Sequence, residues 1–390
     1  MYTKKKISVA ILGSTGSIGT SALKIISKYQ KKFSIKLLVC NSNIKLFKKQ
    51  ILKFSPKYAY INDANCKDVL KKLNLKSKTI IINDFSSLQK KFEKLKIDKT
   101  VLGISSVDGL DYAFLFAKFS NEILVANKES IICGGKLLLK EAKKNNCIIT
   151  SIDSEHYCLG KLLINKNINQ IDRIYLTASG GPFLGKSKSY QNKAAVSAAI
   201  NHPNWSMGQK ISIDSATMVN KILEIIEAHI LFDLPFSKIK IKIHRESLVH
   251  AIVVMKNGLI NIIAHDTTMT IPIRNALFDD LYYHQRINCF NKKLFLRLTF
   301  DEKMLSHFDI ILISNKIFKS GHRAWILFNV INDCLVNKYL NKVIFFNDIV
   351  IKLIKVFSKR SVMVYCKKKI KTFSDIKKTI NFGKQIAHNL

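Results

Sequence analysis

The N-terminal part of the chain repeats one pattern, in which a short run of β-branched and aliphatic residues is followed by a segment with helical spacing. The run KISVAILG (6–13) leads through a glycine-containing turn into SIGTSALKIISKY (17–29), and similar alternation continues to about residue 150. Strands that are joined through helices run parallel, and buried parallel strands are apolar on both faces. The pattern therefore predicts an α/β fold with an N-terminal doubly wound, Rossmann-like parallel sheet.

Three glycines mark the turn between the first predicted strand and its helix. Gly13, Gly16 and Gly19 form a GxxGxxG variant of the dinucleotide-binding fingerprint. Such a turn lets the backbone approach a pyrophosphate and directs the amides of the helix N-terminus at the anion. A tight turn without a ligand has the same glycine requirement, so the spacing indicates a nucleotide only because a strand precedes it and a helix follows.

The end of the second predicted strand indicates which nucleotide is bound. NAD enzymes usually place an acid there, which binds the two ribose hydroxyls. This strand instead ends in Cys40, followed by Asn41, Ser42 and Asn43. The missing carboxylate favours NADP, because a carboxylate would repel the 2′-phosphate.

The pattern changes after about residue 171, which indicates a second, mixed domain. Two strand-like runs on either side of KNG (256–258) predict a hairpin, and the last helix is predicted to begin at a Ser374 N-cap. We expect a nucleotide-binding domain, an α+β domain, a linker and a C-terminal helical domain over 1–150, 151–280, 281–305 and 306–390 respectively.

Composition excludes several classes of protein. Hydrophobic residues make up 47% of the 390, which is too many for a disordered chain. No apolar run reaches the length of about 18 residues that a membrane span needs, and the N-terminus lacks a signal-peptide cleavage site. The 8 cysteines are scattered without a CxxC pair, which favours reduced thiols in the cytoplasm over a disulfide frame or a zinc site.

The net charge of +37 raises the question of a nucleic-acid partner. The lysines are spread over the whole chain, arginines are few, and no recognised nucleic-acid motif is present. We therefore interpret the charge as a solvated basic surface, with no nucleic acid or membrane as partner. Such a surface still favours anionic small molecules through long-range attraction.

Two acids follow an apolar run in IITSIDSEHY (148–157). Alternate side chains of a strand share a face, so Asp153 and Glu155 are expected to point the same way from a strand end. Two neighbouring carboxylates repel each other unless a cation lies between them. The stretch is either a solvated strand end or part of a cation site.

A third acid is available in ISIDSATMVNKILEIIEAHILF (211–232), which is expected to be one helix from about Ser215. Asn220, Glu224 and Glu227 then lie opposite the apolar stripe, with Lys221 beside Glu224. On this segment alone, an amphipathic helix with solvated Glu–Lys pairs is the simpler interpretation. If the three acids do meet, oxygen ligands would select Mg²⁺ or Mn²⁺ over zinc.

Two further loops carry polar clusters. TASGGPF (177–183) places Ser179 beside a glycine pair, where backbone and hydroxyl donors can converge on an anion. NHPNWSMGQK (201–210) contains His202, Trp205 and Met207. Its Trp either anchors the loop to the core or belongs to a lid that closes over a substrate.

Six segments occur in an order and spacing that resemble the 1-deoxy-D-xylulose 5-phosphate reductoisomerase family. The resemblance extends from the N-terminus to about residue 275. The segments are GSTGSIG (13–19), VANKES (125–130), DSEH (153–156), SGGPF (179–183), HPNWSMG (202–208) and KISIDSATMVNKILEIIEA (210–228).

The resemblance implies a reaction and its cofactors. In this family one divalent cation, Mg²⁺ or Mn²⁺, chelates the ketone and a hydroxyl of the phosphosugar, whose skeleton rearranges before NADPH reduces the resulting aldehyde. The product is 2-C-methyl-D-erythritol 4-phosphate, an isoprenoid precursor, and the enzymes are usually homodimers.

The resemblance also implies residue roles. The cation ligands correspond to Asp153, Glu155 and Glu224, and the closing loop to Trp205 and Met207. Substrate-binding residues correspond to Lys128, Ser154, Ser179, His202, Ser215, Asn220 and Lys221. Cofactor contacts correspond to Thr15, Gly16, Ser17, Ile18, Asn43, Asn127, Glu129 and Gly208.

The chain departs from the family pattern at several places. Asn41–Asn43 replaces a common Gly-Lys-Asn run, which removes a cation near the 2′-phosphate and predicts weaker NADPH affinity. Ile222 stands where glycine is usual. HDTTMTIPI (265–273) and the C-terminal helices match the family poorly, and NVIND (329–333) replaces an asparagine-rich segment. We expect these changes to affect the lid, the dimer contacts and the efficiency more than the reaction.

An alternative is another NAD(P)-dependent dehydrogenase, of the homoserine or semialdehyde type. Such an enzyme needs no divalent cation and uses a catalytic Cys or Lys instead. The acids at Asp153, Glu155 and Glu224 argue against it.

Overall fold

The computed structural model describes residues 5–63, 65–66, 78–93, 95–205, 207–278 and 297–390. The chain divides into two compact units. Unit 1 comprises Met1–Ser130, Leu138–Asp153 and Met269–Gln285, and unit 2 comprises Ile131–Leu137, Ser154–Thr268 and Arg286–Leu390. The division at 150, 280 and 305 stays a prediction, and most of the expected linker lies outside the described residues.

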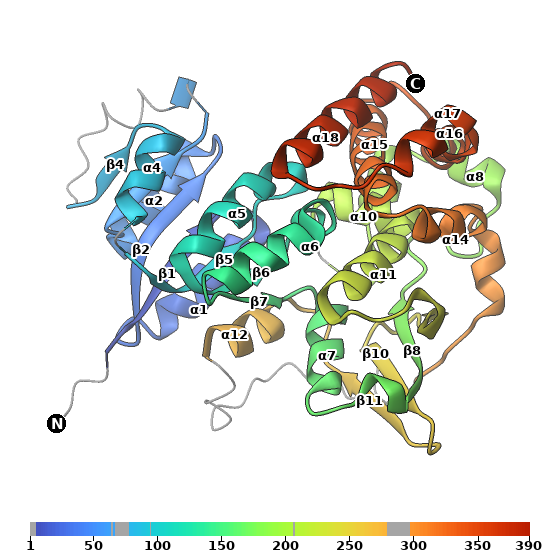
Figure 1. Cartoon of the computed structure of the whole chain (residues 1–390), viewed down its shortest axis with the longest axis horizontal. Coiled ribbons are helices and arrows are strands. Elements are labelled where there is room, and N and C mark those ends of the chain that lie inside the picture. Colours follow the sequence, from blue (N-terminus) through green and yellow to red (C-terminus); the bar gives the residue numbers. More distant parts are fainter. Residues whose placement is uncertain (1–4, 64, 67–77, 94, 206, 279–296) are drawn as a thin grey trace. The chain divides into compact units, whose positions relative to one another are not determined.

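Unit 1 is built on a seven-stranded sheet in the order β4-β3-β2-β1-β5-β6-β7, and every pair is parallel (Figure 1). The strands are β1 (Ile7–Leu12), β2 (Phe33–Cys40), β3 (Tyr58–Ile61), β4 (Ile80–Ile82), β5 (Ile97–Leu102), β6 (Ser120–Val125) and β7 (Ile148–Ser151). The helices are α1 (Ser17–Lys28), α2 (Ile44–Phe54), α4 (Phe85–Phe92), η1 (Ser106–Asp108), α5 (Gly109–Phe119), α6 (Lys128–Lys144) and α12 (Thr270–Phe278).

This strand order confirms the predicted doubly wound sheet and locates its binding edge. The chain builds outward from β1 in one direction as far as β4 and then returns to β5 to build in the other. Ligands of such sheets bind outside the carboxyl ends of the strands where this reversal occurs. The glycine turn follows β1, so it lies at the reversal.

Burial explains why the strands of unit 1 read as continuous apolar runs. The side chains of Val9, Ala10, Ile11 and Leu12 are all fully buried, as expected for a central strand that is covered on both faces. Phe278 of α12 packs edge-on against Phe33, with ring centroids 5.1 Å apart. The core therefore includes a helix that is distant in the sequence.

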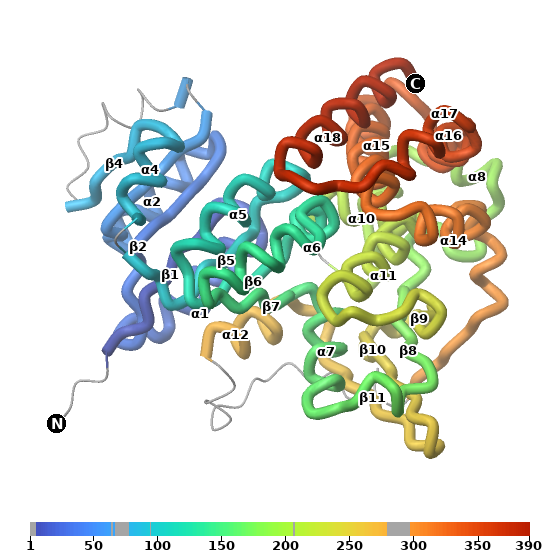
Figure 2. Tube along the Cα trace, viewed as in Figure 1, coloured from blue at the N-terminus to red at the C-terminus, as the bar shows by residue number. Residues whose placement is uncertain are grey.

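Unit 2 contains a mixed four-stranded sheet in the order β11-β10-β8-β9, all labelled in Figure 2. Strands β10 (Val249–Met255) and β11 (Ile260–Ala264) pair antiparallel around Lys256–Gly258, which confirms the predicted hairpin. The other strands are β8 (Ile171–Ala178) and β9 (Ile239–Ile243). The helices before β10 are α7 (Ser154–Leu163), η2 (Ile168–Gln170), α8 (Lys188–Lys193), α9 (Val196–Ile200), α10 (Gln209–Ala216), α11 (Val219–Phe232) and η3 (Phe236–Lys238).

The C-terminal part of unit 2 is helical, as predicted. Its elements are η4 (Lys303–His307), α14 (Ile311–Lys319), α15 (His322–Leu340), α16 (Phe346–Ser358), α17 (Arg360–Cys366) and α18 (Phe373–His388). The last helix begins two residues earlier than predicted from Ser374, because Thr372 and Asp375 form a capping box. Among the described residues, no helix has both the length and the apolar character needed to cross a membrane.

Candidate active site

At the glycine turn after β1, the backbone lies very close to the backbone of the loop after β5. Gly13 has φ +87°, and a Cβ atom there would lie 2.8 Å from the carbonyl carbon of Gly103, in the loop after β5. Any larger residue is excluded by contact and by conformation. Gly16 caps α1 and is exposed with Ser17, so the N-terminus of that helix is accessible at the turn. This geometry suits a pyrophosphate.

A buried pair that the sequence did not indicate fixes this turn. The Ser14 hydroxyl donates to Gln50 Oε1 over 2.8 Å, and Gln50 Nε2 donates back to the Ser14 carbonyl oxygen, also over 2.8 Å. Gln50 belongs to α2, so this helix holds the turn at two points. The only available signal was a glutamine on the buried face of a helix.

The other proposed cofactor residues of unit 1 also follow strands at this edge. Asn43 caps α2, and its side chain accepts a hydrogen bond from the Leu46 amide. Asn127 caps α6 by accepting from the Ser130 amide, while its Nδ2 donates to the Ser106 carbonyl over 2.7 Å. Thr15 and Ile18 lie in the turn and the first turn of α1, and Glu129 lies in the first turn of α6. Gly208 belongs to unit 2 and caps α10.

The two acids of DSEH do not share a strand face, so that prediction is wrong. Strand β7 ends at Ser151, and helix α7 begins at Ser154, which places Glu155 in the first helical turn. Asp153 is bonded directly to Ser154, so the peptide bond keeps it beside this turn. Negative side chains are favoured at a helix N-terminus, which is a local reason for the acids there.

The predicted third acid joins them. Carboxylate oxygens of Asp153, Glu155 and Glu224 all lie within 4.8 Å of one another. Glu224 is only 1% exposed, and so is Glu227, so the interpretation of solvated Glu–Lys pairs on this helix is wrong. Burial of a carboxylate is unfavourable without compensating charge.

Two ammonium groups supply part of that charge. Lys221 Nζ lies 2.9 Å from Glu155 Oε1 and also contacts Glu224 Oε2, and Lys128 Nζ lies 2.5 Å from Asp153 Oδ2. Burial lowers the pKa of Lys221, but the two carboxylates outweigh this effect, so its pKa is raised. Three carboxylates against two ammonium groups leave an excess of negative charge. A divalent cation with oxygen ligands fits this donor set.

The helix that carries Glu224 begins later than predicted. Met218 has φ +65°, and this left-handed residue separates α10 from α11. Ser215 therefore lies on α10, while Asn220, Lys221 and Glu224 lie on α11. Methionine rarely takes a positive φ, so this corner could not be predicted from the sequence.

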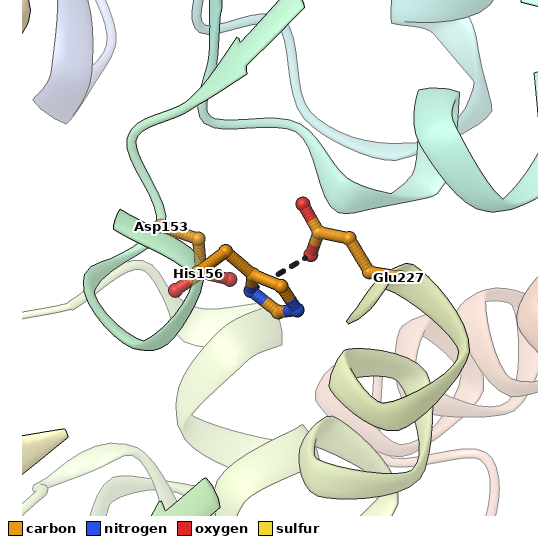
Figure 3. A group of neighbouring side chains, drawn as sticks. All are labelled: Asp153, His156 and Glu227. Carbon is orange, nitrogen blue, oxygen red and sulfur yellow. Dashed lines mark ion pairs between the residues drawn. The ribbon is translucent and has the colours of Figure 1, made fainter. Parts of the chain in front are cut away.

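His156 links the two helices that carry acids, and the sequence did not identify it as a site residue. Its Nε2 lies 2.8 Å from the Glu224 carbonyl oxygen and must be the donor, because a carbonyl only accepts. Its Nδ1 lies 3.3 Å from Glu227 Oε2, the contact that Figure 3 marks with a dashed line. Asp153, His156 and Glu227 form a second group of possible cation ligands.

Ser179 and His202 form a polar pair whose proton positions can be assigned. The amides of Asn204 and Trp205 both donate to His202 Nδ1, so Nε2 carries the proton and donates to Ser179 Oγ over 2.7 Å. Burial lowers the pKa of His202 to about 4, which keeps the ring neutral. Ser179 Oγ also accepts from the Gly181 amide over 3.1 Å. Its own proton is thereby left to donate to a further acceptor.

The remaining predicted residues lie near these groups in unit 2. Ser154 donates to Glu155 Oε2 over 2.6 Å, in the first turn of α7. Trp205 packs edge-on against His250 of β10, with ring centroids 5.8 Å apart, and Met207 is half-buried.

Comparisons with known proteins identify the family. Three family models match in succession: 1-deoxy-D-xylulose 5-phosphate reductoisomerase over residues 9–135, the reductoisomerase C-terminal domain over 149–232, and the DXP reductoisomerase C-terminal domain over 266–386. The resemblance therefore extends well beyond residue 275.

Curated relatives agree with these models. The 1-deoxy-D-xylulose 5-phosphate reductoisomerase of Pelagibacter ubique is 42% identical over 349 residues, which cover 89% of this chain and 90% of the relative. The enzyme of that name from Wolbachia sp. subsp. Drosophila simulans is 38% identical, with 88% of each chain covered.

Solved structures of that name have the same fold. A DOX-P reductoisomerase in complex with NADPH, fosmidomycin and magnesium is 31% identical, covers 98% of this chain and 97% of its own, and has a TM-score of 0.88. The Zymomonas mobilis enzyme in complex with NADPH is 27% identical, covers 99% of both chains and has a TM-score of 0.87. From these matches, the chain belongs to the 1-deoxy-D-xylulose 5-phosphate reductoisomerase family.

Proposed function

We propose how the residues described above carry out the reaction of this family. The protein converts 1-deoxy-D-xylulose 5-phosphate into 2-C-methyl-D-erythritol 4-phosphate, with NADPH and a divalent cation, in isoprenoid precursor synthesis. It is thus not a dehydrogenase of the homoserine or semialdehyde type. The observation that carries the proposal is the convergence of three carboxylates, two at the start of α7 and one on α11, in a chain of this family.

Asp153, Glu155 and Glu224 would hold the cation, which when bound polarises the ketone oxygen of the substrate and fixes its orientation. Lys221 contacts two of these acids and Lys128 the third, so both ammonium groups limit repulsion within the set. Each is also a donor for substrate oxygens beside the acids. The Ser154 hydroxyl orients Glu155 through its hydrogen bond.

The phosphate would be bound by neutral donors together with one cation. His202 and the Gly181 amide both donate to Ser179 Oγ, which directs the serine proton at a phosphate oxygen. Ser215, Asn220 and Lys221 supply a hydroxyl, an amide and an ammonium from the corner between α10 and α11. Charge-assisted hydrogen bonds of this kind are roughly twice as strong as neutral ones.

NADPH, which supplies the hydride, would lie along the carboxyl edge of the sheet in unit 1. The exposed amides at the start of α1 face its pyrophosphate, with Thr15, Gly16, Ser17 and Ile18 in contact. Asn43, Asn127, Glu129 and Gly208 complete the proposed set. At the end of β2, Asn62 Nδ2 donates to Asn41 Oδ1, so an amide stands where NAD enzymes place an acid.

The loop with Trp205 and Met207 would close over the substrate and exclude water from the rearranging intermediate. We also propose a homodimer through β11, which is an edge strand with exposed Ile260 and Ile262 and is preceded by exposed Leu259. Light scattering of Ile262→Lys, compared with wild type, tests this: a mass unchanged from wild type would remove β11 from the interface.

Free cysteines among the described residues support action in the cytoplasm.

The reaction is tested by following NADPH oxidation. Oxidation should require both 1-deoxy-D-xylulose 5-phosphate and Mg²⁺ or Mn²⁺, and EDTA should stop it. Turnover that persists in EDTA would contradict the cation site.

Asp153→Asn should abolish turnover but leave the binding of NADPH, followed by its fluorescence, intact, since the proposed pyrophosphate contacts lie at the glycine turn. Glu224→Gln should shift the metal titration to higher concentration, and an unchanged titration would remove Glu224 from the ligand set.

A further inference from the structure

The helix that carries Ser215 is fastened to the C-terminal helical part by a buried polar chain. Asp214 of α10 is 2% exposed and Asn332 of α15 is fully buried. Asn332 Nδ2 donates to Asp214 Oδ1 over 2.7 Å, and Lys210 Nζ lies 2.9 Å from Asp214 Oδ2. Lys210 Nζ also lies 3.9 Å from Asp333 Oδ1. The series of polar contacts therefore begins and ends at neighbouring residues of α15, Asn332 and Asp333.

This arrangement satisfies a carboxylate that would otherwise be unfavourable in the interior. Each oxygen of Asp214 has one donor, an amide on one side and an ammonium on the other. Buried carboxylates without such donors are strongly disfavoured. Lys210 and Asp214 are four residues apart and therefore lie on one face of α10, the face toward α15. The contact thus sets the rotation of α10 about its own axis.

The rotation of α10 determines where the Ser215 hydroxyl points. Ser215 follows Asp214 directly, about 100° further around the helix. A side-chain tip lies about 5–6 Å from the helix axis, so a roll of about 10° moves it by about 1 Å. A misplacement of about 1 Å can reduce a rate by about a hundredfold.

The other side of α10 has little freedom to absorb such a roll. A Cβ atom at Gly181 would lie 2.8 Å from Ala216 Cα, so the loop that follows Ser179 packs directly on this helix. Beyond α10, the left-handed Met218 leads into α11 with Asn220, Lys221 and Glu224. A change at Asp214 would therefore displace hydrogen-bond donors on both sides of the phosphate position that we propose at the corner between α10 and α11.

We infer that Asp214 and Asn332 are positioning residues for the phosphate-binding donors, so that the C-terminal helix α15 fixes the geometry of a site to which it contributes no ligand. This inference rests on the proposed role of Ser215 in phosphate binding. It gives a function to Asn332, within the segment NVIND that departs from the family pattern.

The chain offers a matched control on the same helix. Asn329 is also fully buried on α15, one turn earlier, but its Nδ2 faces the Cys133 sulfur at 3.5 Å and not α10. Asn332→Ala should raise both the KM for the phosphosugar and the inhibition constant of inorganic phosphate by about tenfold, while NADPH binding is unchanged. Asn329→Ala should lower the melting temperature about as much as Asn332→Ala does, but should change neither the KM nor the inhibition constant. Equal effects of the two variants on phosphate would overturn the inference.

A charge exchange keeps the test decisive if the alanine variant does not fold. Asn332→Asp alone sets two carboxylates against each other and should weaken phosphate binding at least as much as Asn332→Ala. The double variant Asp214→Asn/Asn332→Asp restores an amide–carboxylate pair and should recover most of the wild-type affinity. Failure of this rescue in a folded double variant would contradict the positioning role. Calorimetry measures the affinity of each variant for inorganic phosphate and does not depend on turnover. A wild type that binds phosphate but does not turn over the phosphosugar would contradict the proposed function and leave this inference standing.

Discussion

Individual residues of the site differ from ordinary surface residues because their charged side chains are buried away from water. Lys221, Glu224 and Glu227 are each at most 3% exposed, and each has a partner of opposite charge or a histidine. Ordinary helix surfaces carry Glu and Lys in water, where such pairs contribute little. Removal of one partner from a buried pair is far more damaging, at about 3–5 kcal/mol. Burial therefore marks these residues as a site more clearly than their spacing does.

His202 gives a prediction about pH. Burial lowers its pKa from 6.5 to about 4, so the folded protein binds this proton less readily than the unfolded chain. The stability that His202 contributes is complete above pH 6.5 and is lost as the pH falls toward 4, by roughly 3 kcal/mol in all at about 1.4 kcal/mol per pKa unit. His202→Gln keeps a donor near Nε2 but does not titrate. Its free energy of unfolding should fall less steeply than that of wild type over this pH range.

The comparison with wild type isolates His202. Burial also lowers the pKa of His250 to about 3, but both proteins contain this residue and its effect cancels. Imidazole resonances in NMR provide a direct check. A His202 ring that titrates near 6.5, or unfolding curves with the same pH slope, would refute the assigned neutral ring.

The residues that could be predicted from sequence are those with a local pattern. The acids, Ser179 and His202 stand in short polar motifs, and the glycine turn follows a strand. The contacts Ser14–Gln50 and Asp214–Asn332 could not be predicted, because the residues of each pair are 36 and 118 positions apart, respectively, and no local pattern records a contact over such a separation. Proton positions on His202 likewise depend on backbone amides whose direction only the fold determines.

At the scale of elements, the errors concern where helices begin. The sequence predicted one helix from Ser215, but Met218 breaks it into α10 and α11. It also predicted that Glu155 lies on a strand, whereas α7 starts at Ser154. Helix periodicity is strong inside an element and weak at its ends, where capping and tertiary contacts decide. The existence and order of the elements were predictable for the same reason.

The loop after β8 gives a prediction with an internal control. Gly181 and Gly185 have φ of +69° and +80°, so alanine at either position is strained by about 1–2 kcal/mol. A Cβ at Gly185 meets nothing within 4 Å, whereas one at Gly181 would lie 2.8 Å from Ala216 Cα. Gly185→Ala should therefore lower only the free energy of unfolding. Gly181→Ala should lower it further and raise the KM for the phosphosugar, because the loop with Ser179 is pushed from α10.

Chemical denaturation and steady-state kinetics of the two variants separate these effects. The strain is common to both, so the difference between them measures the contact with α10. If Gly185→Ala changed the KM as much as Gly181→Ala does, the loop would be responding to backbone strain and the packing on α10 would not matter.

For the whole molecule, the alternation of strands and helices was enough to predict the parallel sheet, and the strand order then places the glycine turn at its reversal. The mixed sheet of unit 2 was visible only through one hairpin. Its strands β8 and β9 pair although they are far apart in the sequence, and no local pattern records such a pairing. Contacts within an element are therefore readable from sequence, and contacts between distant elements are not.

The net charge of +37 leads to a prediction about ionic strength. Lysines are spread over the chain, so their combined field attracts the anionic phosphosugar from a distance and does not depend on one patch. Between about 0.01 M and 0.1 M salt the Debye length falls from about 30 Å to about 10 Å. Over this range kcat/KM for 1-deoxy-D-xylulose 5-phosphate should fall by about three- to tenfold, while kcat at saturating substrate stays constant. The uncharged sugar 1-deoxy-D-xylulose, assayed at high enzyme concentration, is the control and should show no such dependence. An equal salt dependence for both sugars would mean that salt acts on the protein itself, and the distributed charge would then have no part in substrate capture.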